Sequence, residues 1–200
     1  MTDSIVPIVE GHSEVEAVPV LMRRLCDEWL KYPLEIGKPV RAKRHQIIKE
    51  GELERRVILA MRRPNCRAIL LILDADEDCP KDLAPSLLER VKRVAHDKLV
   101  SVVLPKCELE SWFIGSIESL RGVRGISSEA CSPNSPETIR DAKGYLTREM
   151  EANRHYVEVD DQPAFAAEFD INQAFNNCRS FKKFYNDFRN IVDSLTSLRR

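Results

Sequence analysis

Four acidic residues directly follow an apolar run in the middle of the chain. Residues 69–73 are apolar throughout, which is typical of a strand covered on both faces in a parallel sheet. The run ends in Asp74, Asp76, Glu77 and Asp78. Carboxylates so close together repel one another, and a divalent cation is an effective counter-charge for them. The alternative interpretation is a solvated acidic loop that also caps the following helix.

Two further acidic sites follow predicted strands. Glu10 follows residues 5–9, and Glu108 and Glu110 follow residues 100–104. Because the carboxyl ends of parallel strands meet at one edge of a sheet, we expect all three acidic sites to converge there. Carboxylate oxygens in such number suit Mg²⁺ or Mn²⁺ rather than zinc. Taken alone, Glu10 has a simpler interpretation, as an acid that favours the dipole of the next helix.

The elements that must position these acids alternate along the chain. Apolar runs predict strands, and apolar stripes at helical spacing predict helices between them. The predicted strands cover residues 5–9, 34–36, 69–73 and 100–104, and the helices begin after Ser13, at residue 52 and after Pro80. Ser13 and Glu16 match a capping box. This order predicts an α/β fold with a largely parallel sheet flanked by helices.

The C-terminal part of the sequence has helical patterns without further strands. We divide the chain into an α/β domain at residues 1–126 and a helical extension at residues 127–200 that packs on it. Ser135 before Pro136 predicts a helix that runs to about residue 152. We expect the aromatic residues between 181 and 188 to pack in the core rather than to stack on bases. Trp112 and Phe113 are likewise expected in the core.

Composition bounds the class of protein. Of the 200 residues, 32% are charged and 43% hydrophobic, which is typical of a globular protein. The formal net charge of −1 gives no overall basic field, so nucleic acid would have to be bound by a local patch. The densest basic run contains Arg41, Lys43 and Arg44, and it predicts either a phosphate-contacting loop or a solvated face.

Cysteine spacing and hydropathy indicate where the protein works. The six cysteines form no C-x-x-C pair, so zinc-site spacing is absent and reduced thiols are expected. There is no apolar run long enough for a membrane span and no signal peptide at the N-terminus. We therefore expect a cytoplasmic protein without a membrane partner.

The acidic motifs resemble the Toprim superfamily. Val9-Glu10-Gly11 with Glu14, and Leu73-Asp74-Ala75-Asp76, look like its pattern of a glutamate after the first strand and Asp-x-Asp after a later one. Toprim domains occur in topoisomerases, bacterial primases, recombination-mediator proteins and overcoming-lysogenization-defect nucleases. The segments at residues 108–113, 141–143 and 180–184 are similar to one bacterial Toprim-like family, domain of unknown function 4276. Its members are often encoded beside an ATPase in anti-phage defence loci.

The resemblance implies a Toprim-like, Rossmann-like fold and a Mg²⁺- or Mn²⁺-dependent nuclease that hydrolyses DNA or RNA. Glu10 would be the general acid/base or a metal ligand, and Asp74 and Asp76 would hold the ion. Asp78, Glu108 and Glu110 would be ligands of a second ion. Lys106 would stabilise the transition state, and Arg41, Lys43 and Arg44 would contact the nucleic-acid backbone. Two ions about 4 Å apart clamp both ends of an in-line displacement. ATP dependence would come from a separate ATPase partner.

Two other functions compete with the nuclease. The first is a non-catalytic Toprim-like subunit that binds within an ATPase complex. The second is a receiver-like phosphoacceptor, with Asp74 as the acceptor and Lys106 after a later strand. No tyrosine is positioned by motif as a topoisomerase nucleophile, so strand passage is not expected.

Overall fold

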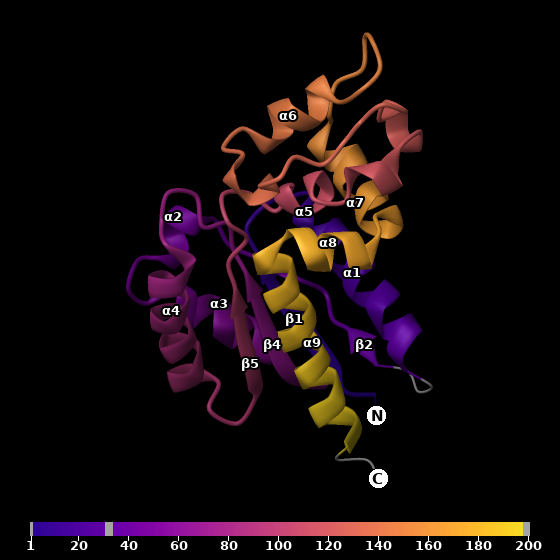
Figure 1. Cartoon of the computed structure of the whole chain (residues 1–200). Coiled ribbons are helices and arrows are strands. Elements are labelled where there is room, and N and C mark those ends of the chain that lie inside the picture. Colours follow the sequence, from indigo (N-terminus) through magenta and orange to yellow (C-terminus); the bar gives the residue numbers. More distant parts are fainter. Residues whose placement is uncertain (1, 31–33, 198–200) are drawn as a thin grey trace.

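The protein has three layers, with a parallel sheet between two layers of helices (Figure 1). This computed structural model describes residues 2–30 and 34–197. The strands lie in the order β2 (Glu35–Ile36), β1 (Ser4–Val9), β4 (Cys66–Ile72) and β5 (Leu99–Val103), and β3 (Val40–Arg41) also pairs with β1. Every strand pair is parallel. The predicted α/β fold with a parallel, Rossmann-like sheet flanked by helices is therefore confirmed.

Pro7 lies in the middle of β1, although proline cannot donate a hydrogen bond to a neighbouring strand. The carbonyls of Ile5 and Val9 accept bonds from the N–H groups of Gly37 and Ala42. Pro7 shares their side of the strand, so it faces the interruption between β2 and β3. The chain that pairs with this side of β1 is therefore interrupted, between β2 and β3, opposite the residue of β1 that has no N–H donor.

Alternate residues of the strands face two separate apolar clusters. In β4, Ala68, Leu70 and Ile72 belong to one cluster, while Ile69 and Leu71 belong to the other. The first cluster is covered by α1 (Glu14–Trp29) and α9 (Arg179–Ser197), and the second by α3 (Glu52–Met61) and α4 (Pro80–Val94). Burial on both faces explains why the central strand has a continuous apolar sequence.

The C-terminal segments share the first cluster with the sheet. Ile5 and Val9 of β1 lie in the same cluster as Phe184 and Phe188 of α9. Between β5 and α9 lie α5 (Ser111–Ile114), three short 3₁₀ turns (Ile117–Leu120, Val123–Gly125, Pro136–Thr138), α6 (Ala142–Arg148), α7 (Glu158–Glu168) and α8 (Ile171–Asn177). The division into domains at residues 1–126 and 127–200 stays a prediction. Residues 1 and 198–200, at the outer limits of these two domains, lie outside the described residues.

One local prediction is wrong here, and one short helix was not predicted. The helix predicted from Ser135 is a 3₁₀ turn, and α6 begins at Ala142, where the Asp141 carboxylate accepts the Gly144 N–H at 3.0 Å. Ser135 makes no capping bond, so the helix begins where a side chain supplies one. The basic run also contains a short helix, α2 (Arg44–Ile47), which its sequence does not indicate.

The aromatic stripe of α9 lies in the core, as predicted. Phe184 is fully buried, with ring centroids 5.2 Å from Trp112, 5.7 Å from Phe181 and 5.9 Å from Phe188. Trp112 and Phe113 are also buried. These rings attach the last helix to the sheet, so they are not a surface for stacking bases. None of the helices in the described ranges is long and apolar enough to cross a membrane.

We expect Phe184→Ala to lower the free energy of unfolding by about 3–5 kcal/mol, because it leaves a cavity among three aromatic rings. Phe175→Ala is the matched control: Phe175 is only half-buried on α8, so its truncation should have a clearly smaller effect. Urea unfolding followed by tryptophan fluorescence measures both. Equal losses in the two variants would contradict this account of the core.

Candidate functional site

Five carboxylates from three segments converge at the carboxyl edge of the sheet. Glu10 follows β1, Asp74 follows β4, and Glu108 and Glu110 follow β5, while Glu14 is the first residue of α1. The pKa of Asp74 lies well above its usual value because of burial and the negative charges of the other four residues. The structure thus brings together Glu10, Asp74, Glu108 and Glu110, as the sequence predicts, and adds Glu14.

Glu10 has one carboxylate oxygen without a partner. Its Oε1 accepts the N–H of Arg44 at 3.2 Å, whereas its Oε2 is buried and receives no hydrogen bond. Burial raises the pKa of Glu10, the Arg44 N–H opposes this rise, and the charge of Asp76 adds to it. A buried acceptor without a donor is uncommon in a folded protein, and it is available to a cation, a proton or water.

Glu14 is held against the backbone of the turn that carries Glu10. Its Oε2 accepts the Glu10 N–H at 3.0 Å. A Cβ atom on Gly11 would lie 2.9 Å from Glu14 Oε1, so a glycine there allows this close approach. Burial, followed by the charges of Glu110 and Glu10, raises the pKa of Glu14 to about 8, against the lowering effect of the backbone N–H donors.

Asp74 joins the loops after β4 and β5. Its Oδ1 accepts the N–H of Leu109 at 2.9 Å. Since Leu109 lies between Glu108 and Glu110, this bond fixes both glutamates beside Asp74. Among the described side chains, no cation pairs with the Asp74 carboxyl group.

Glu110 is buried and receives donors from the C-terminal part of the chain. Its Oε1 accepts bonds from the hydroxyl of Tyr156 at 3.2 Å and from Nε2 of Gln162 at 3.3 Å. Burial raises the pKa of Glu110 to about 7, although the charge of Lys143 lowers it. This carboxyl group therefore changes its charge near neutral pH.

Lys143 is the cation beside Glu108 and Glu110 of the acidic cluster. Its Nζ lies 2.7 Å from Glu158 Oε2 and 4.0 Å from one oxygen each of Glu108 and Glu110. Burial lowers the pKa of Lys143, but the surrounding carboxylates outweigh it and raise the value. Glu158 also accepts the hydroxyl of Ser13 at 2.6 Å. Ser13 makes no bond as a helix cap, so the predicted capping box with Glu16 is wrong.

Arg44 neutralises the other side of the cluster. Its guanidinium donates to the carbonyls of Asp74 and Ala75 at 2.9 and 3.1 Å, lies 3.4 Å from Asp76, and bonds to Asp78. The side chains of Asp76 and Asp78 are about half exposed, at 54% and 55%. These two predicted metal ligands are therefore paired with an arginine that we predicted to contact nucleic acid.

The remaining predicted residues are exposed around the cluster. Arg41 donates to the carbonyl of Glu10 at 3.4 Å, and Lys43 directly precedes α2. Lys106 follows β5 and lines a pocket beside α4 and α9. The basic residues thus flank the acidic cluster on the surface, where a polyanion can reach them.

The cluster has oxygen ligands of the kind that bind a hard cation, but these oxygens are not arranged around one ion position. The carboxylate oxygens and the unpartnered Glu10 Oε2 suit Mg²⁺ or Mn²⁺. No three acidic, histidine or cysteine side chains in residues 2–30 and 34–197 lie close enough together to hold one ion in this conformation. Side-chain rotation about fixed backbone positions would have to bring the oxygens around an ion.

The fold and the cluster define an α/β protein with an acidic site at the carboxyl edge of a parallel sheet. A family model, Domain of unknown function (DUF4276), matches residues 9–189. The chain therefore belongs to this family. Searches of curated proteins and of solved structures gave no match.

Several residues of the cluster are absent from the predicted site. Glu14 and Lys143 occur in the motifs that carry the resemblance, which is the signal that could have assigned them to the site. Tyr156, Glu158 and Gln162 carry no motif. They reach the cluster because α7 packs against α1, a contact between distant segments that spacing does not indicate.

We expect the metal-free protein to lose stability as the pH rises from about 5 to 8. Glu14 has a pKa of 4.5 when unfolded and about 8 when folded, so only the folded state holds its proton in this range. Stability therefore decreases with pH. Glu14→Gln, whose amide oxygen can still accept the Glu10 N–H, should raise the free energy of unfolding at pH 8 by at least about 1 kcal/mol.

Urea unfolding in EDTA at pH 5, 6.5 and 8 measures this dependence. Glu16→Gln is the matched control, because Glu16 is exposed on the same helix turn. A pH dependence that is unchanged in Glu14→Gln would contradict the charge repulsion described for the cluster.

Proposed function

We propose that this protein is a Mg²⁺- or Mn²⁺-dependent nuclease that hydrolyses phosphodiester bonds of DNA or RNA. The observation that carries the proposal is the convergence of Glu10, Glu14, Asp74, Glu108 and Glu110, with raised pKa values. Arg44 and Lys143 flank this cluster, and Glu10 Oε2 is left unpartnered. Excess negative charge out of water is typical of a site that a cation completes.

Glu10 and Asp74 would hold the ion, with Glu108 and Glu110 available for a second one. A bound ion would offset charge on the phosphate and activate water. Asp76 and Asp78 would join the ligands only after Arg44 releases them. Rotation of Arg44 away from these acids would also free its guanidinium for a phosphate, which couples the two roles that the sequence predicts.

The chain's own acids are suited to proton transfer near neutral pH. Glu110, with a pKa of about 7, can accept or release a proton under ordinary conditions. Tyr156 and Gln162 orient its carboxyl group through their bonds to Oε1. Arg41 and Lys43, exposed beside Glu10, would contact the phosphate backbone of the substrate.

The resemblance to the Toprim pattern supports the same chemistry, because Glu10 and Asp74-Ala75-Asp76 match its glutamate and Asp-x-Asp. On the same resemblance, we propose that a separate ATPase works with this chain in anti-phage defence. The chain would then be the cleaving component of a two-protein system.

A second candidate is a non-catalytic binding subunit of an ATPase complex. The ion pairs of Arg44 with Asp76 and Asp78, and the contacts of Lys143 with Glu108 and Glu110, favour it. In this role the cations would neutralise the acids permanently. The receiver-like phosphoacceptor has less support, since no ion pair joins Lys106 to Asp74 within the described residues.

We expect the purified protein to cleave plasmid or single-stranded substrates with Mn²⁺, alone or with its ATPase partner. Glu10→Gln and Asp74→Asn should each lower the rate by at least about 100-fold and weaken Mn²⁺ binding, because each removes a charged ligand. Gel electrophoresis measures cleavage, calorimetry measures Mn²⁺ binding, and circular dichroism checks folding.

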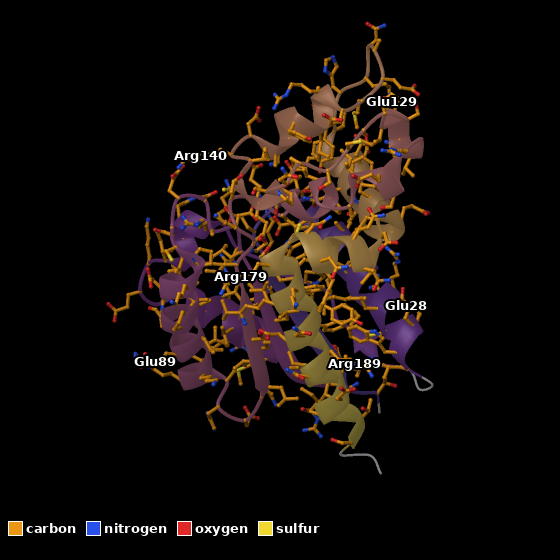
Figure 2. The ribbon with its side chains drawn as sticks, viewed as in Figure 1. Glu28, Glu89, Glu129, Arg140, Arg179 and Arg189 are labelled. Carbon is orange, nitrogen blue, oxygen red and sulfur yellow. The ribbon has the colours of Figure 1, made fainter. Side chains whose placement is uncertain are left out.

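Glu89→Gln is the matched control, since Glu89 is an exposed acid on α4 that pairs with Arg93 of the same helix (Figure 2). Its variant should cleave as the native protein does. A native protein that binds neither Mn²⁺ nor Mg²⁺ and stays inert with the ATPase would reject the nuclease in favour of the binding subunit.

A further inference from the structure

A pocket of about 610 Å³ lies where α4, β5 and the start of α9 meet. Among the described strands, β5 pairs with β4 alone, so the pocket opens at the free edge of the sheet. Figure 1 shows α4 and α9 on opposite sides of β5. The volume is in the range of pockets that hold a small organic ligand.

One part of the pocket wall is apolar. Ala84, Pro85 and Leu88 contribute from α4, and Val102 and Leu104 contribute from β5 and the residue that follows it. Leu104 and Val102 are buried from solvent, and Leu88 is only partly covered by the core. A planar or aliphatic group of a ligand would lose its water on this wall.

Another part of the wall is basic. Lys81, Lys106 and Arg179 all line the pocket, and none of them has an ion pair within the described part of the chain. Arg179 lies at the N-terminal end of α9 (Figure 2). Lys183 also lines the pocket, but its Nζ is 2.5 Å from Asp187.

The acid that lines the pocket is already engaged. The Glu137 carboxylate accepts the N–H groups of Arg179 and Ser180 at 2.8 and 2.9 Å. Its charge is therefore directed at the first turn of α9 and does not pair with Lys81 or Lys106. The pocket keeps an excess of positive charge beside an apolar wall.

Such a wall fits an organic phosphate, whose body is apolar and whose head is an anion. We propose that the pocket binds a nucleotide, with the base and sugar against Ala84 and Leu88 and the phosphate at Lys81, Lys106 and Arg179. The choice of a nucleotide among organic phosphates rests on the proposed function, because Lys106 lies two residues before Glu108 of the acidic cluster. The nucleotide is either the end of a nucleic-acid strand or a free mononucleotide.

Calorimetric titrations of the whole chain in EDTA test this proposal without metal or cleavage. The probes are adenosine 5′-monophosphate, adenosine and hexyl phosphate. We expect the nucleotide to bind at least fivefold more tightly than either compound, since only the nucleotide has both the base and the phosphate.

Lys81→Gln and Arg179→Gln should each weaken binding of the nucleotide by at least fivefold. Lys92→Gln is the matched control, because Lys92 is exposed near the other end of the same helix as Lys81. Its affinity should be that of the native protein. Competition by a 5′-phosphorylated hexanucleotide identifies the strand end as the ligand, and lack of competition identifies the free mononucleotide.

Absence of nucleotide binding by the native protein would overturn the proposal. Hexyl phosphate that binds as tightly as the nucleotide would also overturn it. So would a Lys92→Gln variant that weakens binding as much as Lys81→Gln, because the effect would then depend only on the overall charge of the protein. If the nucleotide binds as expected while no cleavage occurs with Mn²⁺ even in the presence of the ATPase partner, the nuclease is wrong and the pocket assignment holds.

Discussion

Repulsion among the carboxylates at one edge of the sheet is the constraint on which the structure around the site depends. Burial raises the pKa values of Glu14 and Asp74, and the charges of Glu10 and Glu110 raise both values further because little water screens them. The packing of the whole domain has to hold these groups together against that repulsion. Stability at the site is therefore traded for a concentration of charge, as is usual where a protein binds a cation or transfers a proton.

Backbone N–H groups, rather than side-chain cations, hold the centre of the cluster. The N–H groups of Glu10, Arg44 and Leu109 donate to Glu14, Glu10 and Asp74, in that order. In the part of the chain that the structure describes, the cations that pair with acids of the site lie on two flanks, at Arg44 and Lys143. A network built in this way fixes the position of each acid and leaves carboxyl groups without a cation between the flanks, which is the property that the proposed metal site requires.

The last third of the chain completes the site rather than only covering the sheet. Lys143, Tyr156 and Gln162 reach Glu110, and Glu158 pairs with Lys143. The aromatic core under α9 also fixes the position of Arg179 at the pocket, because the same helix carries both. Both the acidic cluster and the pocket therefore depend on the packing of the C-terminal helices.

The sequence by itself determined the fold class and the convergence of the acids. Apolar runs that each end in acidic residues specify parallel strands, and parallel strands bring their ends to one edge whatever their spacing in the chain. It also predicted that Trp112 and Phe184 lie in the core, because local periodicity records which side is buried. Only the tertiary structure decided which acids are paired with cations. Arg44 reaches Asp78, and Lys143 reaches Glu158, through contacts between segments that no local pattern relates. The cap of α6 is Asp141 rather than Ser135, because hydrogen-bond geometry and not residue type selects the capping residue.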